Sequence, residues 1–387
     1  MTHILRALAL LVPAILVLGG CSAPAVCPKC PEAGPAASAP VRYEPAPFAT
    51  LPGWAGAELA PGLRAFVAGC PRIAAASALG RACAAARELP AADEAAARRF
   101  VEETFSAWAV LTPEGSAEGL VTGYYEPVLP GSRERSARFR YPVYGPPPDL
   151  VTVDLEAQHP ELRNLRLRGR LEGTRLVPYW TRGEIEAMDL RAPVLAWVED
   201  PVELLFLQIQ GSGQITLESG ERLRLGYADQ NGHPYRSIGR FLVERGELKL
   251  ERASMQGIKA WAAANPAKLR EALDANPSYV FFRELPASSD GPPGTLGVPL
   301  SAGYSLAVDP RAVPLGAPVY LATSWPLSAK PLERLMAAQD TGGAIRGAAR
   351  ADFFWGTGAE AGSLAGQMRQ RGRQWILWPR GEPLPLL

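Results

Sequence analysis

Apolar and polar positions recur with two different periods along this chain, and the change of period divides it into parts. Between residues 59 and 110, apolar side chains recur every three or four positions, which predicts helices over 59–87 and 91–110. Asp93 stands near the start of the second helix, where a capping residue is expected. The apolar stripe of this helix, which we interpret as core, contains Phe100, Val101, Phe105 and Trp108.

From Leu120 to about Leu225 the helical period gives way to short apolar runs separated by proline and glycine. This pattern is typical of a β-rich module. Residues 178–184 indicate the start of a short helix capped by Thr181. The apolar runs that we interpret as strands are 194–198, 204–207 and 215–217.

Helical spacing returns at 237–245 and 254–275, where two Asn-Pro dipeptides act as stops. A second β-rich block begins at Tyr279, and a helix over about 359–371 within it is ended by Gly372. The predicted strands of this block are 279–283, 303–308, 317–322, 333–339, 351–355 and 373–378. Because helical segments lie on both sides of 120–225, that module looks like an insertion into a second domain.

The N-terminus carries a targeting signal. Arg6, an apolar run over 7–18 and small residues before Cys21 predict a secretory signal over 1–21, too short for a stable transmembrane helix. The sequence Leu-Gly-Gly-Cys that ends at Cys21 resembles a bacterial lipobox, and Ser22 resembles its outer-membrane-directed form. Acyl chains on Cys21 would hold the protein on a membrane. Secretion with an incidental cysteine is the alternative.

Composition limits the class of protein without naming a function. With 387 residues the chain exceeds the usual size of a single core, so two domains are expected. A hydrophobic content of 47% and a charged content of 20% are typical of a globular protein. The net charge of +1 lacks the basic surplus of nucleic-acid-binding proteins, so we expect no such partner. A monomer is our default expectation.

The remaining cysteines suggest disulfides. Residues 22–50 are rich in proline and alanine without periodicity, which predicts an extended tether. Cys27 and Cys30 lie in this tether, where a local disulfide is favoured over a zinc or redox centre. Cys70 and Cys83 flank a predicted helical hairpin and are a second possible pair.

Two aspartates provide the strongest signal for chemistry. Asp352 follows Ala351 and precedes Phe353-Phe354-Trp355, and such apolar surroundings raise the pKa of a carboxyl group toward the range of a general acid. Asp340 ends an apolar run and precedes Gly342 and Gly343, whose N–H groups would favour its ionised form. On spacing alone, a capped turn followed by a surface aspartate explains the pattern equally well.

A resemblance to a known family favours the catalytic interpretation of these aspartates over the capped turn. The segments AVDPRAVPLG (307–316), QDTGGAIRG (339–347) and ADFFWG (351–356) resemble the 3D domain, named for three aspartates, here Asp309, Asp340 and Asp352. Three further motifs narrow the resemblance to the family of membrane-bound lytic murein transglycosylase A. They are VTGYYEP (121–127), LQIQGSGQI (207–215) and GYADQNGHPYRSIGR (226–240).

The resemblance implies a mainly β fold with flanking helices and two domains. A double-psi β-barrel domain would comprise 51–125 and 226–387, and a smaller β-barrel-like domain, inserted over 126–225, would leave a groove between them. A groove at a domain interface is also where a substrate site is expected on general grounds.

The resemblance also implies a reaction and its residues. Lytic transglycosylases cleave the β-1,4 bond between N-acetylmuramic acid and N-acetylglucosamine in peptidoglycan without water and leave 1,6-anhydromuramyl ends. Asp352 would be the general acid and then base, Asp340 would support it, and Asp309 would either contact substrate or cap a turn. Because the sugar's own hydroxyl attacks, no protein nucleophile is needed. The residues expected to bind the glycan are Thr122, Gly123, Tyr124, Tyr125, Gln208, Gln210, Ser212, Gly213, Tyr304, Gly342 and Gly343.

We therefore expect a peptidoglycan lytic exotransglycosylase, lipid-anchored on the periplasmic face of the outer membrane, although the residues leave exolytic and endolytic action open. The three histidines make no metal-ligand spacing, so we expect neither metal nor cofactor. Two alternatives remain. One is a hydrolase that pairs Asp352 with Asp340 or Glu126, and the other is a murein-binding lipoprotein without activity.

Overall fold

The computed structural model describes residues 41–90, 93–159, 167–286 and 291–385. Pro40–Leu387 form one unit by their internal contacts. The predicted signal, the lipidation site at Cys21 and the pair Cys27 and Cys30 lie outside the described residues. Within the described part, no helix is both long and apolar enough to cross a lipid bilayer.

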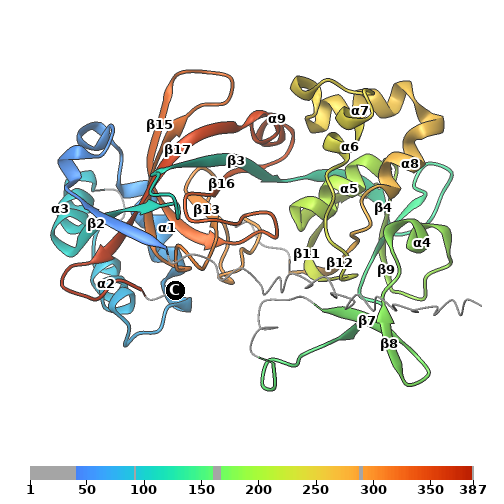
Figure 1. Ribbon diagram of the computed structural model, residues 1–387, viewed down its shortest axis with the longest axis horizontal. Helices are drawn as coiled ribbons and strands as arrows, with labels where there is room; N and C mark the ends of the chain where they lie inside the picture. The colour runs from blue at the N-terminus through green and yellow to red at the C-terminus, as the bar shows by residue number, and fades with distance from the viewer. Residues whose placement is uncertain (1–40, 91–92, 160–166, 287–290, 386–387) are drawn as a thin grey trace, which may run out of the picture. The chain divides into compact units, whose positions relative to one another are not determined.

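A closed ring of strands organises one part of the molecule. Within the described residues, an eight-stranded sheet has the order β1-β2-β17-β14-β15-β13-β16-β3, and β3 also pairs with β17. The ring therefore contains β17, β14, β15, β13, β16 and β3. The strands β3, β13, β15, β16 and β17 are seen together in Figure 1. The bounds are β1 (Arg42–Ala46), β2 (Phe105–Leu111), β3 (Glu118–Glu126), β13 (Ser305–Val308), β14 (Pro318–Ser324), β15 (Pro331–Asp340), β16 (Ala351–Thr357) and β17 (Arg369–Pro379).

Three helices, α1 (Ala60–Gly69), α2 (Ala78–Arg87) and α3 (Glu94–Thr104), share the apolar core of this sheet. Asp93 caps α3, as predicted, by accepting a hydrogen bond from the Ala96 amide. The predicted helix over 91–110 is too long, because its second half is β2, whose residues pair with both β1 and β17. The end of the predicted tether is likewise structured, since β1 pairs with β2.

The second part of the molecule contains two smaller sheets. The larger has the order β12-β11-β10-β4-β9-β5 and the smaller the order β6-β7-β8. The bounds are β4 (Val128–Ser132), β5 (Tyr141–Tyr144), β6 (Val151–Thr152), β7 (Arg168–Glu172), β8 (Arg175–Pro178), β9 (Val194–Val198), β10 (Ser212–Leu217), β11 (Arg222–Gln230) and β12 (Val280–Leu285). All of these strands fall between β3 and β13 in sequence, so this part interrupts the ring.

The predicted insertion ends too early. Its predicted end at residue 225 divides β11, which pairs with both β10 and β12, so the second sheet continues to Leu285. The double-psi connection, the small inserted barrel and the groove remain predictions from the family resemblance.

The helices of the second part are α4 (Arg182–Ala187), α5 (Pro201–Gln210), α6 (Ile238–Glu244), α7 (Met255–Ala264) and α8 (Leu269–Asp274). Thr181 caps α4 with a reciprocal capping box, as predicted. The predicted strand 204–207 is wrong, since it forms the middle of α5. Asp200 caps that helix, and Gly211, in the left-handed region, ends it. The predicted helix 359–371 ends earlier, as α9 (Ala359–Gln367), because β17 already begins at Arg369.

Cys70 and Cys83 form a disulfide that closes a loop with a sequence separation of 13. Both sulfurs lie in the core shared by α1 and α2. Because a crosslink reduces the entropy of the unfolded chain, replacing both cysteines by alanine should lower the free energy of unfolding by about 3 kcal/mol. Chemical denaturation with and without reductant measures the effect. An unchanged midpoint in the reduced wild-type protein would contradict the expectation, and the double variant, which lacks this disulfide in either condition, is its control.

Candidate active site

Strand register brings the two aspartates onto one face of the ring. Asp340 of β15 pairs with Ala307 of β13, Ala307 pairs with Asp352 of β16, and Asp352 pairs with Thr122 of β3. Side chains of directly paired residues project from the same face of a sheet. Because adjacent strands lie about 4.8 Å apart, the Cα atoms of Asp340 and Asp352 are about 10 Å apart. The small side chain of Ala307 leaves space between them.

A register shift makes this alignment possible. Leu306 pairs with Ala338, but the next residue, Ala307, pairs with Asp340, so β15 carries one extra residue, Gln339. The Gln339 side chain is fully buried and hydrogen-bonds Ser305 and the Ala65 carbonyl oxygen. The shift therefore turns Gln339 into the core and presents Asp340 on the face of Asp352.

Successive side chains of β16 point to opposite faces of the sheet, and this determines what surrounds Asp352. Ala351 and Phe353 belong to the core of the ring, whereas Asp352 projects from the opposite face and is partly accessible. Its Oδ1 accepts a 2.6 Å hydrogen bond from the Thr122 hydroxyl. The pKa of Asp352 is raised to about 6, because burial and the negative charge of Asp340 together outweigh the lowering effects of Thr122 and the Arg350 charge. The predicted direction of this shift agrees with the structure, but Ala351 and Phe353, which were expected to cause it, lie on the opposite face of the strand.

Asp340 is held by donors that the sequence analysis did not identify. Its Oδ1 accepts hydrogen bonds from the amide and hydroxyl of Thr295, at 2.9 and 2.8 Å, and from the Thr341 amide at 2.9 Å. The predicted donors, Gly342 and Gly343, do not make these bonds. Burial outweighs the bonds and raises the pKa of Asp340, so the prediction of a favoured ionised form was wrong. Thr295 lies 45 residues upstream, and no sequence pattern marks it.

Tyr124 lies beside both aspartates. Its ring packs at 5.1 Å from the Phe354 ring, and the charges of Asp340 and Asp352, after burial, help to raise its pKa. Among the described residues, its buried hydroxyl has no partner at regular hydrogen-bond geometry, although it is near enough to lower the pKa of Asp340. A role of Tyr124 in substrate binding remains a prediction.

The third aspartate of the motif is engaged in a turn. Asp309 is 2% exposed and accepts hydrogen bonds from the Arg311 guanidinium at 3.0 and 2.7 Å and from the Gly347 amide at 2.8 Å. Burial opposes its ionisation, but these bonds together lower its pKa. The contacts fit the turn-capping alternative, in which Asp309 fixes the loop that connects β15 to β16.

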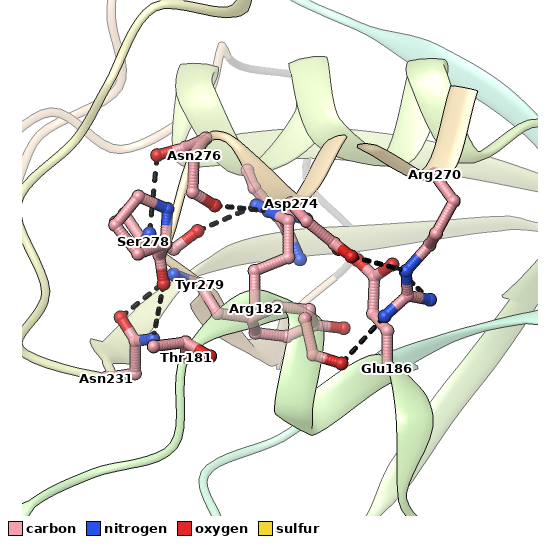
Figure 2. A network of polar contacts seen from close by, with 12 residues as sticks. Thr181, Arg182, Glu186, Asn231, Arg270, Asp274, Asn276, Ser278 and Tyr279 are labelled. Atoms are coloured by element: carbon pink, nitrogen blue, oxygen red, sulfur yellow. Dashed lines mark hydrogen bonds and ion pairs between the residues drawn. The ribbon is translucent and has the colours of Figure 1, made fainter. Parts of the chain in front are cut away.

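Other predicted glycan contacts serve packing. Gln208 is buried and bonds Arg182, which also donates to the carbonyl oxygens of Asn276 and Ser278 and to Glu186. Figure 2 shows Arg182 at the centre of this network of polar side chains and backbone groups. Its guanidinium, only 2% exposed, is thus satisfied by protein groups, so Gln208 has a structural role in this network.

The remaining predicted residues divide into packed and accessible ones. Gly123 lies against Trp355 and Ala365, and Gly213 against Leu207, so neither has room for a side chain. Tyr125 is buried, and its amide donates to the Gln210 side chain at 3.1 Å. The partly or fully accessible positions are Gln210, Ser212, Tyr304, Gly342 and Gly343. Of these, Tyr304 lies beneath the Arg334 guanidinium at 5.2 Å, against the core of the ring.

Glu126, the alternative second carboxylate, is 1% exposed. It accepts hydrogen bonds from Thr357 at 2.7 Å and Gln214 at 2.9 Å and forms an ion pair with Arg224 at 3.4 Å. These partners come from the ring and from the second sheet, so Glu126 ties the two parts together where β3 ends and β4 begins.

Comparisons with known proteins agree with this architecture. The family model of the MltA specific insert domain matches residues 120–283, and that of the 3D domain matches residues 304–378. Membrane-bound lytic murein transglycosylase A of Escherichia coli K12 is 35% identical over 279 residues, which are 70% of this chain and 68% of that protein. The namesake from Vibrio cholerae is 32% identical over 271 residues, 68% of this chain and 66% of that protein.

Solved structures show the same fold, mainly β with helices. The structure of MltA from Neisseria gonorrhoeae in a monoclinic form is 43% identical, has a TM-score of 0.79 and covers 90% of this chain and 95% of that one. Escherichia coli MltA with bound chitohexaose is 30% identical with a TM-score of 0.65, covering 88% and 94% of the two chains. Two family models in sequence and this similarity over most of its length show that the chain belongs to the family of membrane-bound lytic murein transglycosylase A.

Proposed function

We propose that this protein is a lytic transglycosylase that cleaves the β-1,4 bond between N-acetylmuramic acid and N-acetylglucosamine in peptidoglycan and leaves a 1,6-anhydromuramyl end. The observation that carries the proposal is Asp352, a partly accessible carboxyl group with a pKa of about 6, on the same strand face as Asp340. The names of the relatives and the chitohexaose bound to one of them support the choice of substrate.

The mechanism needs one group that first gives and then takes a proton. Neutral Asp352 protonates the glycosidic oxygen as the bond to the muramic acid C1 breaks and positive charge develops on that sugar. The 6-hydroxyl of the same sugar then attacks C1, and the Asp352 carboxylate accepts its proton. Because attacker and target belong to one molecule, their effective concentration is very high and no water is consumed.

Two neighbours assist this cycle. The Thr122 hydroxyl donates to Asp352 and stabilises it most when it is a carboxylate, after the proton has left. Asp340, when ionised, stabilises the positive charge that develops on the sugar. Tyr124, whose side chain is partly accessible beside the two aspartates, is a proposed contact of the glycan.

The products distinguish this reaction from hydrolysis. Incubating the detergent-solubilised protein with purified murein should yield fragments ending in 1,6-anhydromuramic acid, as identified by mass spectrometry. The second candidate is hydrolysis by Asp340 and Asp352, favoured by their common face, since two carboxyls several ångströms apart can activate water. In water enriched in oxygen-18, hydrolysis would label the new end, whereas anhydro closure would not. An intact sacculus would instead indicate a binding protein.

The rate should depend on pH through Asp352. Since the first step needs the neutral acid, turnover should fall as pH rises above about 6, by about tenfold per pH unit. The Asp340 charge raises this pKa, so Asp340→Asn should move the alkaline limb of the pH profile to lower pH. Initial rates on soluble glycan strands between pH 4.5 and 8 would measure both effects. An alkaline limb that stays in place or moves to higher pH in Asp340→Asn would contradict the interaction between the Asp340 charge and Asp352.

We further propose that Cys21 is lipidated and that the monomeric enzyme is held on the periplasmic face of the outer membrane. Cys21→Ala should transfer the protein from the membrane fraction to the soluble fraction, because its acyl chains supply the membrane affinity. Retention of this variant in the membrane would reject lipidation at Cys21.

A further inference from the structure

Arg350 is linked to Asp352 through the hydroxyl group of Thr122. It stands just before β16, two residues ahead of Asp352, and is partly buried. Its Nη2 donates a 2.7 Å hydrogen bond to the Thr122 hydroxyl oxygen, whose own hydrogen goes to Asp352 Oδ1 at 2.6 Å. Arg350, Thr122 and Asp352 thus form a chain of two short hydrogen bonds across the parallel pair β3 and β16.

Donor and acceptor chemistry fixes the first bond of this chain and favours one direction for the second. A guanidinium has only donors, so the Thr122 oxygen must accept from Arg350. A hydroxyl has one hydrogen, and Asp352 Oδ1, 2.6 Å away, is an acceptor placed to receive it. With the Thr122 hydrogen pointing at Oδ1, this oxygen acts as the acceptor, and because the carbonyl oxygen of a neutral carboxyl group accepts better than its hydroxyl oxygen, the acidic proton favours Oδ2.

The guanidinium itself is held in place. Its Nη1 donates to the backbone carbonyl oxygen of Leu120 at 3.3 Å and to that of Ala351. Both carbonyl groups belong to the strands that carry Thr122 and Asp352, so the cation keeps its orientation as long as those strands stay paired. This anchoring distinguishes Arg350 from a solvated surface arginine.

We propose that Arg350 is a positioning residue that turns the Thr122 hydroxyl toward Asp352 and so places the acidic proton of Asp352 on Oδ2. The proton then leaves from Oδ2 toward the glycosidic oxygen, and the same oxygen receives the proton of the 6-hydroxyl. Oδ1 stays bonded to Thr122 throughout, so the carboxyl group keeps its orientation between the two proton transfers. This inference rests on the proposed function and adds a residue to it.

The test is a double-mutant cycle with two conservative controls. Arg350→Met removes charge and donors, Arg350→Lys keeps both, Thr122→Val removes the hydroxyl, and Thr122→Ser keeps it. We expect kcat on glycan strands to fall on the order of tenfold in Arg350→Met and Thr122→Val, part of the 10²–10⁴ that a general acid supplies, with KM changing less than twofold. The Lys and Ser variants should recover most of the loss.

The double variant Thr122→Val/Arg350→Met should be no slower than Thr122→Val alone, because Arg350 acts through the hydroxyl. The inference would be overturned if kcat fell in the double variant by the product of the two single-variant factors, or if kcat were unchanged in Arg350→Met. Circular dichroism checks folding. If Arg350→Met does not fold, the inference is judged from the loss of kcat in Thr122→Val, its recovery in Thr122→Ser and the kcat of Arg350→Lys.

A second readout does not depend on turnover. Removing the Arg350 charge should raise the pKa of Asp352, measured by carboxyl ¹³C titration with Asp352→Asn for assignment, while Arg350→Lys should leave it near the wild-type value. An unchanged titration in Arg350→Met would also overturn the inference. If the wild-type protein leaves murein intact, the proposed function fails, but this titration still reports whether Arg350 acts on Asp352.

Discussion

Asp352→Asn should reduce murein turnover by about 10³- to 10⁴-fold, because an amide neither donates the proton to the glycosidic oxygen nor accepts the one from the 6-hydroxyl. Glycan binding should survive, since the amide oxygen can still accept the Thr122 hydrogen bond. Release of anhydro ends measures turnover, and retention on insoluble murein measures binding. Activity within tenfold of the wild type would assign the acid to another residue.

The same variant should change stability in a pH-dependent way. The pKa of Asp352 is about 6 in the folded protein against an ordinary 3.8, so the folded state resists its ionisation. Below about pH 4 the group is neutral in both states and Asp352→Asn should have little effect. As pH rises through 6, the wild-type protein loses stability that the variant keeps, about 2 kcal/mol after allowing for partial exposure.

Asp309 provides the matched control for this stability test. Its pKa is lowered in the fold, so its charge stabilises the folded state at pH values above its unfolded pKa. Asp309→Asn should therefore be less stable than the wild type at pH 7, the opposite of Asp352→Asn. Thermal unfolding at pH 4 and pH 7 compares the two variants. If the unfolding temperatures of both variants shift in the same direction from the wild type at pH 7, the opposite effects assigned to the two carboxyl groups are wrong.

The second large effect concerns stability at Glu126. Glu126→Ala should lower the free energy of unfolding by about 3–5 kcal/mol, because Arg224, only 7% exposed, would lose the carboxylate beside it. Denaturant titration measures the change. Glu126→Gln is the milder control, since its amide oxygen can still accept from Thr357 or Gln214.

Glu126→Gln also separates structure from catalysis. In the proposed reaction Glu126 never meets substrate, so the folded Gln variant should turn over murein within about threefold of the wild type. A loss of 10² or more in a variant that remains folded would revive the hydrolase alternative in which Glu126 is the second carboxylate.

Local sequence patterns predicted several elements because their signals are local. Asp93 and Thr181 precede helices that they cap, and the strand that carries Asp352 is recognisable from its aromatic neighbours. Residues 204–207 were assigned the wrong type because a short apolar run does not distinguish a buried strand from a buried helix. The deciding signals, Asp200 and Gly211, lie at the two ends of α5.

The region 105–111 shows a different limit. Phe105 and Trp108 fit the helical stripe that begins in α3, but pairing with β1 and β17 makes this stretch a strand. Strand pairing depends on partners far away in sequence and can override local propensity. The same reason explains why β17 begins inside the predicted helix 359–371.

By itself, the sequence determined the family and singled out the two aspartates as candidates, because motifs are local properties of the chain. The tertiary structure alone decided how these groups meet. The register shift at Gln339, the alignment of Asp340 with Asp352 across Ala307, and the bonds from Thr295 and Arg350 all join residues through strand pairing. The paired strands come from distant parts of the sequence, so no single stretch of it specifies their alignment.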